Sequence, residues 1–548
     1  MSKKRPNFIV IMTDQHRADY LGCAGHPFLK TPAIDSLAAR GTRFTRFYVS
    51  SPVCMPNRAT YMTGRLPTVH GARGNGMPLS LQANTFVDVL RNKGYRTALV
   101  GKSHLMTMTD YPAMWKPKIP EGLEALQGDY AEAVKPWAPD SVYDQENEAN
   151  WARDPNWKLK FPFYGFERVH LCTGHGDQVS GEYIHWLKKQ GKDPAQITGR
   201  NNALSADISV PQAWRTSVPE ELYPTRYIQD HSIQVLEDHA KSGKDDPFFM
   251  MMSFPDPHHP FTPPGKYWNM YSPNQVKLPP NFYARPDDLG GPVDSAIHAH
   301  EEKGYDAEKT MAFMKINERQ AKEAIALTCG MITMIDDAIG AVLAKLKALG
   351  LDENTIVMFS SDNGPHREGG HNPDFFQSSG GLNGIKRDLT EGGVRVPFIV
   401  RWPGKIKPGS VSEHVSGFQD LLPTAADLVG AKVTAECDGL SFLPTLLGNK
   451  PQQKPHPHLF WYGSEKGGKL SVLKWPWKLF HLNTGSAEAS DESENSAAKK
   501  KPAAVKPLVV QLFNLETDPT ESKNVASENP KLVEELAAIM KQAWRDPT

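Results

Sequence analysis

Phe8-Ile9-Val10-Ile11-Met12 is an apolar run that leads directly into the polar residues Thr13-Asp14-Gln15-His16-Arg17. Uninterrupted apolar runs of this length, in contrast to alternating ones, are typical of strands buried on both faces of a parallel sheet. Three further apolar runs end in polar clusters in the same way, within residues 97–104, 248–260 and 355–364. We therefore expect the carboxyl ends of these strands to gather polar side chains into one site at a single edge of a sheet.

Predicted helices separate the predicted strands. The segments 31–40 and 85–93 are short helix candidates, whereas 227–241 and 321–349 are longer and carry apolar residues at helical spacing. Strands that alternate with helices over most of the chain predict an α/β fold with a doubly wound, mostly parallel central sheet. In such folds, ligands bind beyond the carboxyl ends of the strands.

The length of 548 residues favours two domains, or one large domain with a smaller companion. We predict a large α/β domain over residues 1–435, in which residues 110–226 form a capping insertion that would house ligand selection. Short strand-like pieces and a final helix predict a smaller α+β domain over residues 436–548. Within that domain, the composition of residues 485–507 predicts a disordered surface loop.

The overall composition limits the expected partners. Lysine plus arginine and aspartate plus glutamate number 62 each, so no basic face for nucleic acid is indicated. The five cysteines are widely spaced, which favours free thiols in a reducing compartment. No apolar run approaches the length of a membrane span, and the apolar start lacks a signal-peptide cleavage site. We expect a cytoplasmic protein without nucleic acid or membrane partners, and the sequence predicts no oligomeric state.

Cys54-Met55-Pro56-Asn57-Arg58 stands at a predicted loop-to-helix junction. Pro56 suits the first helical position, where its missing N–H matters least, and Gly64 is expected to end the helix. This arrangement places Cys54 at the positive end of a helix dipole with Arg58 one turn above it. Such a position predicts a stabilised thiolate or a bound anion. The alternative is an ordinary buried cysteine that packs as a small apolar residue.

Asp14 and the pair Asp362-Asn363 follow two of the predicted strands and offer oxygen ligands. Ligand sets made of oxygen suit Ca²⁺ or Mg²⁺ better than Zn²⁺ or Cu²⁺. Taken alone, Asp-Asn-Gly is also a common turn sequence, and any one nearby histidine is also compatible with a structural role. Together with Arg58, further positive or protonatable side chains at the same edge can surround a tetrahedral oxyanion. These side chains are Lys102, His104, His258 and Lys386.

Cys54-x-Pro56-x-Arg58 resembles the signature of the type I sulfatases, which belong to the alkaline phosphatase superfamily. The resemblance extends over nearly the whole chain, because the other motifs also occur in the order of that family. These motifs are Asp14 after the first strand, Gly101-Lys102-Ser103-His104, Pro257-His258-His259-Pro260, Asp362-Asn363-Gly364, residues 384–397 and residues 512–521.

The resemblance implies an alkaline-phosphatase-like fold and the hydrolysis of an aryl or carbohydrate sulfate monoester. It also implies that a formylglycine-generating enzyme converts Cys54 to Cα-formylglycine, whose hydrate is the nucleophile. One divalent cation is implied, Ca²⁺ first, with Mg²⁺ or Mn²⁺ as alternatives. His258 would protonate the leaving oxygen, Lys102 and Lys386 would hold the sulfuryl oxygens, and Arg58 and His104 would orient the hydrate. The implied metal ligands are Asp14, Gln15, Cys54, Asp362 and Asn363.

One position departs from the commonest family pattern. Many sulfatases carry two consecutive aspartates after the first strand, whereas this chain has Gln15 at the second position and loses a negative charge there. Phosphonate monoester hydrolases resemble this chain at that position and at Asn75. Asn363 and residues 369–376 resemble arylsulfatases instead.

Three functions follow as alternatives. The first is a sulfuric ester hydrolase, and the second is a phosphonate monoester or phosphodiester hydrolase with the same nucleophile. The third is a non-catalytic protein that binds sulfated ligands with Cys54 unmodified. Asn75, His371 and His175 are the candidate substrate-binding residues, although a structural turn explains His175 and its neighbour Asp177 equally well.

Overall fold

The computed structural model describes ten segments of the chain. They are residues 5–109, 143–210, 212–243, 246–278, 317–365, 382–384, 386–433, 437–463, 468–484 and 507–544. The predicted loop at 485–507 therefore falls almost entirely outside the described residues.

A nine-stranded sheet forms the centre, in the order β10-β2-β9-β8-β1-β7-β4-β5-β6. Strand β1 pairs in parallel with β7 and β8, and β4 pairs in parallel with β7 and β5. The antiparallel pairs lie toward the edges, where β9 pairs with β8 and β2, and β6 pairs with β5. The strands are β1 (Asn7–Thr13), β2 (Thr42–Phe44), β4 (Arg96–Lys102), β5 (Arg168–Thr173), β6 (Ser180–Gly181), β7 (Phe248–Ser253), β8 (Thr355–Ser361), β9 (Phe398–Arg401) and β10 (Ser410–Ser412).

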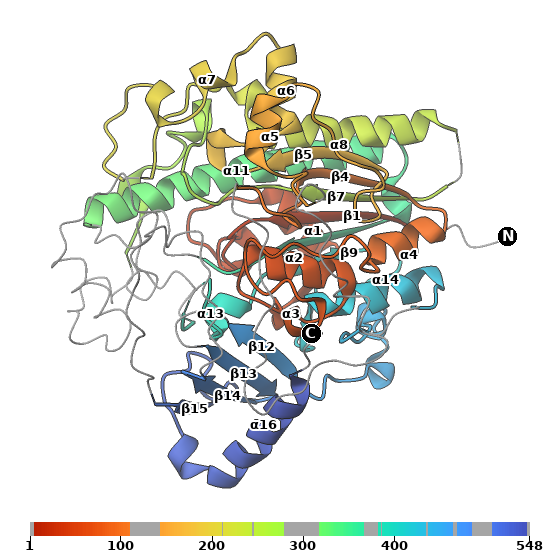
Figure 1. Cartoon of the computed structure of the whole chain (residues 1–548), viewed down its shortest axis with the longest axis vertical. Helices are drawn as coiled ribbons and strands as arrows, with labels where there is room; N and C mark the ends of the chain where they lie inside the picture. The colour runs from red at the N-terminus through yellow and green to blue at the C-terminus, as the bar shows by residue number, and fades with distance from the viewer. Residues whose placement is uncertain are drawn as a thin grey trace.

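The sheet confirms the predicted doubly wound, mostly parallel α/β fold. All residues of β1, β7 and β8 are buried, which is the expected consequence of covering both faces of a parallel sheet. Helices α1, α8 and α11 pack together in one layer, whereas α2, α4 and α14 form another (Figure 1). The helices are α1 (Pro32–Ala39), α2 (Cys54–Thr63), α3 (Pro67–His70), α4 (Phe86–Asn92), α5 (Glu148–Arg153), α6 (Glu182–Lys189), α7 (Pro194–Ile197), α8 (Pro224–Lys241), α11 (Glu318–Ala348), α13 (Glu391–Val394), α14 (Leu421–Val429), α15 (Leu443–Leu446) and α16 (Pro530–Ala543).

Helix α11 is the longest helix of the described chain, and its 31 residues include a window with a mean hydropathy of 1.6. By length and composition this helix meets the requirements of a membrane span, although we predicted no apolar run of that length. However, 72% of that window is buried inside the protein. The pattern is that of a core helix, and its side chains pack against α1 and α8.

Strand β5 lies inside the segment that we predicted to be a capping insertion. Residues 168–173 alternate partly between polar and apolar side chains, so they do not form the uninterrupted apolar run that marks the inner strands. The strand nevertheless pairs with the whole carboxyl half of β4. The segment 110–226 therefore includes part of the central sheet as well as loops and short helices, and its residues 110–142 lie outside the described chain.

A separate four-stranded antiparallel sheet follows the central one, in the order β12-β13-β14-β15. Helix α16 packs on β13 and β14, and this unit buries a second apolar cluster together with Leu66 and Val69. Figure 1 shows this sheet and α16 in blue at the lower end of the molecule. A smaller α+β unit at the C-terminus was predicted. Its strands are β12 (Leu459–Gly463), β13 (Lys469–Lys474), β14 (Trp477–Leu482) and β15 (Val509–Asn514); a further short pair joins β3 (Phe47–Tyr48) to β11 (Ser416–Gly417).

Candidate active site

The carboxyl ends of β1, β4, β7 and β8 and the first turn of α2 meet at one edge of the central sheet. Asp14 directly follows β1, Lys102 ends β4, and Asp362 directly follows β8. Cys54 is the first residue of α2. One potential ligand atom from each of Asp14, Cys54 and Asp362 lies within 4.8 Å of the others, and all three residues are buried. The parallel topology thus brings side chains from distant parts of the sequence into a single site.

Helix α2 begins two residues earlier than we predicted. Val53 is its N-cap, so Pro56 occupies the third helical position and not the first. The first intrahelical bond runs from Asn57 N to Val53 O over 3.1 Å. Pro56 is tolerated because the N–H groups of a helix's first turn have no partner within the helix. Consequently Cys54 itself belongs to the helix, and every residue of α2 is buried.

The surroundings of the Cys54 thiol affect its pKa more than its position at the start of a helix suggests. Its Sγ lies 3.7 Å from Asp14 Oδ1, and Asn363 Nδ2 approaches it to 3.4 Å. Complete burial, followed by the charge of Asp14, raises the pKa of the Cys54 thiol to about 12. Burial and the charge of Asp14 therefore favour the protonated thiol over the predicted thiolate in the unmodified residue.

The oxygen atoms around Cys54 fit a hard divalent cation. Asp14 and Asp362 are two fully buried carboxylates, and Asn363 Oδ1 is buried without a hydrogen-bond partner among the described residues. Buried polar atoms without a partner are rare, and a metal ligand is one explanation of such an atom. Gln15 adopts a left-handed φ of 61°, which is uncommon for a residue other than glycine, and its side chain is partly exposed.

Arg58 holds the ends of three strands together. Its Nε donates to Asp362 Oδ2 over 2.8 Å, and its Nη1 donates to Lys102 O and to Ser253 Oγ over 3.0 and 2.9 Å. The side chain is only 1% exposed. A buried guanidinium paired with a buried carboxylate fixes the position of both groups.

Lys102 and His175 lie against the carboxylate of Asp14. Lys102 Nζ is 2.5 Å from Asp14 Oδ2 and 2.6 Å from His175 Nε2. Burial by itself would raise the pKa of Asp14, but the neighbouring groups, first the positive charge of Lys102 and less strongly that of Lys386, hold it well below its ordinary value. Burial and Lys102 lower the pKa of His175 to about 3, so the ring is neutral and its Nε2 accepts a hydrogen bond from the ammonium of Lys102.

His258 stacks on His175, with ring centroids 3.5 Å apart and an angle of 12° between the planes. Its Nδ1 lies 2.5 Å from His259 O, so this nitrogen carries the proton and donates it to the carbonyl. Burial, then His175 and His259, lowers the pKa of His258 well below its ordinary value. The ring is neutral in this environment, and an anionic ligand beside it would favour protonation.

The remaining sequence candidates divide into three groups. Lys386 and His104 are buried at the same edge, and the charge of Lys102 contributes to lowering the pKa of His104, after burial. Asn75 Oδ1 accepts a hydrogen bond of 3.4 Å from Met55 N, which places Asn75 beside the Cys54 motif. His371 lies outside the described residues.

Comparison with known proteins bears directly on this site. The sequence model of the Sulfatase family matches residues 6–431, which include all the residues gathered at this edge. The chain belongs to the sulfatase family. A second model, described as N-sulphoglucosamine sulphohydrolase, C-terminal, matches residues 385–482. The resemblance to type I sulfatases is thereby confirmed, and the protein is a sulfuric ester hydrolase.

Individual relatives agree with this assignment. An arylsulfatase of Clostridium perfringens is 29% identical over 445 residues, which cover 80% of this chain and 77% of that protein. An N-acetylgalactosamine-6-O-sulfatase of Bacteroides thetaiotaomicron is 26% identical, with coverage of 98% and 93%. A solved phosphonate monoester hydrolase of Agrobacterium radiobacter superposes with a TM-score of 0.70 at 22% identity, over 98% of this chain and 95% of that one. That last similarity supports the fold.

Asn57 is a site residue of this sulfatase that our motif analysis did not single out. Its Oδ1 accepts a hydrogen bond from Ser50 N over 3.0 Å, and its Nδ2 donates to Asp362 O over 2.9 Å. The signal was available, since a polar residue in the middle of a fully buried helix needs such partners. Asn57 thus holds the backbone of Asp362 in place beside the carboxylate.

Asn57→Ala is expected to lower the free energy of unfolding by about 2–4 kcal/mol, because it leaves two buried backbone groups without partners. Urea denaturation followed by circular dichroism measures this change. Asn202→Ala is the matched control, since Asn202 also makes two hydrogen bonds but is partly exposed. Equal effects of the two substitutions would contradict the role of Asn57 in fixing Asp362.

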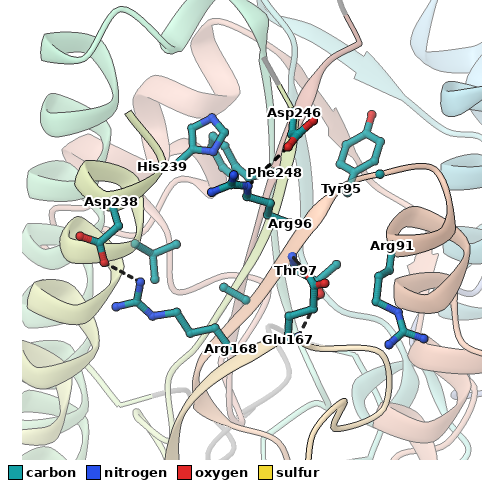
Figure 2. A pocket seen from close by; sticks show the side chains of 13 residues that line it. Arg91, Tyr95, Arg96, Thr97, Glu167, Arg168, Asp238, His239, Asp246 and Phe248 are labelled. Atoms are coloured by element: carbon teal, nitrogen blue, oxygen red, sulfur yellow. Dashed lines mark hydrogen bonds and ion pairs between the residues drawn. The ribbon is translucent and has the colours of Figure 1, made fainter. Parts of the chain in front are cut away.

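A cavity of about 660 Å³ lies at the other edge of the sheet, where β4 and β7 begin. Its lining has three arginines and three acidic residues, and Figure 2 shows two ion pairs among them: Arg96 with Asp246 at 3.7 Å and Arg168 with Asp238 at 2.7 Å. These ion pairs leave no excess of positive charge for a sulfate ester, so this cavity is not the active site of the sulfatase.

Proposed function

We propose that this sulfatase hydrolyses aryl or carbohydrate sulfate monoesters with formylglycine at position 54 and one divalent cation. The buried cluster of Asp14, Cys54 and Asp362, with ligand atoms within 4.8 Å, carries the proposal. Position 54 is 2% exposed and lies among oxygen atoms and positive charges. That environment suits a metal-held oxygen nucleophile better than a thiolate.

The chain offers a suitable set of ligands for the cation. Asp14, Asp362 and Asn363 supply oxygen atoms at the ends of β1 and β8, and Gln15 adds one amide oxygen in place of a carboxylate. A site with oxygen ligands and two formal negative charges fits Ca²⁺ first, with Mg²⁺ and Mn²⁺ as alternatives. When bound, the cation and the formylglycine hydrate supply an oxygen nucleophile at neutral pH.

The surrounding residues bind and orient the sulfate group. Lys102 and Lys386 provide the positive charge that would hold the sulfuryl oxygens, while Arg58 and His104 fix the geometry around residue 54. These groups are buried, so their electrostatic effect on a developing negative charge is stronger than it would be in water. His258 would donate a proton to the leaving oxygen, because the sulfate ester brings the negative charge that favours its protonated form.

His258→Ala is expected to slow the hydrolysis of alkyl and sugar sulfates by about 10²–10⁴-fold, but p-nitrophenyl sulfate by far less. An activated aryl leaving group departs without help from an acid, so the ratio of the two rate losses measures proton donation. His231→Ala, which removes a partly buried histidine of α8, is the control. Equal losses for both ester classes would argue against His258 as the general acid.

The substrate class is tested by a panel of aryl, alkyl and carbohydrate sulfates, with kcat/KM as the readout. Two of the relatives, an arylsulfatase and an N-acetylgalactosamine-6-O-sulfatase, support aryl and sugar sulfates as the starting choice. Failure of every sulfate ester with formylglycine present would contradict the proposal.

Gln15 and Asn75 favour a second activity on phosphonate monoesters or phosphodiesters. The missing carboxylate at position 15 lowers the negative charge beside the cation. Rates for p-nitrophenyl sulfate and phenyl p-nitrophenyl phosphonate, measured on one preparation, separate the two activities. A large preference for the phosphonate with little sulfate turnover would make the second activity the main one.

A further inference from the structure

Glu146 is a fully buried carboxylate in the segment that precedes α5, with a relative exposure of 0%. Its Oε2 accepts a hydrogen bond of 2.7 Å from His104 N. Its Oε1 accepts hydrogen bonds of 2.9 and 3.0 Å from Leu105 N and Met106 N. One side chain therefore binds three successive backbone N–H groups immediately after β4.

Arg58 holds the same loop through its carbonyl groups. Arg58 Nη1 donates to Lys102 O over 3.0 Å and to Ser103 O over 3.4 Å. The guanidinium thus takes the carbonyl groups at the start of the loop, and the carboxylate takes the N–H groups at its end. Charged partners give the stronger kind of hydrogen bond, especially where water is excluded.

The backbone between the contacts of Arg58 and Glu146 is strained at His104, whose φ is 54°. A non-glycine residue persists in this region only when the surrounding structure imposes it. The hydrogen bond from His104 N to Glu146 Oε2 can impose this backbone conformation. Releasing the bond would let His104 return toward the usual φ range and would move its ring.

The segment that carries Glu146 is itself fixed against the loop. Glu148 N donates to Met108 O over 2.9 Å, and Asn147 Nδ2 donates to Thr109 O over 3.2 Å. Trp151 Nε1 closes the segment on itself by donating to Gln145 O over 2.8 Å. The carboxylate is therefore held in position by its own neighbours before it orders the loop.

We propose that Glu146 is a positioning residue that fixes His104 for catalysis. Since Glu146 belongs to residues 110–226, this segment helps to build the catalytic site. The proposal rests on the proposed role of His104. It differs from an ordinary structural role because Glu146 binds the backbone N–H of His104 itself.

The test compares Glu146→Gln with Asp336→Asn. Asp336 is also a buried carboxylate that accepts backbone N–H groups, from Ala33 and Ile34 over 2.9 and 2.8 Å, but at the start of α1. Both variants should lower Tm. Only Glu146→Gln is expected to reduce kcat, by about 10–100-fold with KM changed less than about threefold, since small displacements of catalytic groups are costly. Mass spectrometry must find equal formylglycine content in all variants.

A double-mutant cycle with His104→Ala sharpens the test. If Glu146 acts by positioning His104, its replacement should cost much less activity in the His104→Ala background than in the wild type. Glu146→Asp, which keeps the charge but withdraws it by one methylene, replaces Glu146→Gln if that variant does not fold. Glu146→Asp should likewise lower kcat and change KM little.

Each outcome bears on the proposal. Normal kcat in Glu146→Gln beside an impaired His104→Ala overturns the inference and leaves the proposed function intact. Additive effects of the two substitutions also overturn the inference. Full activity of His104→Ala would overturn the proposed role of His104 and the inference together.

Discussion

Cys54→Ala is expected to reduce kcat/KM for p-nitrophenyl sulfate by at least about 10⁴-fold, the size of effect found when a catalytic nucleophile is removed. The substitution deletes one sulfur atom that contacts Asp14 and Asn363 and leaves the helix intact. The folded protein and its oxygen ligands should therefore persist. Cation binding that persists in calorimetry, weakened only by the missing ligand at position 54, would show that the loss is one of chemistry.

Cys54→Ser separates formylglycine from a simple hydroxyl. Serine offers one hydroxyl group and lacks the second one that releases sulfate, so we expect a comparably severe loss. Cys23→Ala is the control, because Cys23 is a free cysteine outside this site and only partly buried. Near-normal turnover in either Cys54 variant would refute the assigned nucleophile.

Mass spectrometry of the peptide that contains Cys54 tests the modification itself. Conversion of the thiol to an aldehyde makes the peptide about 18 Da lighter. An unmodified peptide in fully active protein would exclude formylglycine. An unmodified peptide in inactive protein that still binds sulfated ligands would instead favour the non-catalytic alternative.

Lys478→Met is expected to lower the free energy of unfolding by about 3–5 kcal/mol, because it removes the cation from a buried charge cluster. Lys478 Nζ lies 2.9 Å from Glu391 Oε1 and 3.1 Å from Glu521 Oε1. All three side chains are at most 1% exposed. Methionine keeps the aliphatic stem, so the change measures the loss of charge and not a cavity.

Lys474→Met is the matched control on the neighbouring strand. Lys474 forms an ion pair of 2.6 Å with Glu535, but both side chains are 50% exposed. Such a surface pair contributes at most about 1 kcal/mol. Measured by urea denaturation, the loss in free energy of unfolding should therefore be severalfold larger for Lys478→Met than for Lys474→Met. Similar losses would show that the buried cluster contributes little to stability.

The buried cluster also connects the C-terminal sheet to the active site. Lys478 belongs to β14, whereas Glu391 begins α13. Helix α13 in turn accepts a hydrogen bond of 3.4 Å at Gly393 O from Gly364 N, just after Asn363. Loss of Lys478 should therefore disturb the proposed metal ligand Asn363 as well as the fold.

The fold was predictable because its inner strands are local features. The apolar run that starts at Phe8 is long enough to indicate burial on both faces, and the polar residues after it mark the edge where ligands gather. The helix starts were also close, since α4 begins after a threonine that forms a capping box with Asp88. Strand β5 was missed because its alternating pattern resembles the loops around it.

The site was predictable only where a residue carries its own signal. Asp14 and Asp362 follow strands, and Cys54 stands in a distinctive motif, so each was named from the sequence. Glu146 and Lys478 act through partners far along the chain, and no local pattern marks them. His175 and Asp177 show the same limit. His175 lies against Asp14, whereas Asp177 accepts hydrogen bonds from Trp214, Thr216 and Gly199 and is structural.

The complete burial of α2 limits when residue 54 can be modified. Cys54 is 2% exposed and begins a helix whose other residues are buried as well. A second protein cannot bind that segment once the chain has folded. If Cys54 is converted to formylglycine, the modifying enzyme must therefore reach it before the chain folds. Chains that fold before Cys54 is modified would be as stable as modified chains, but they would stay inactive.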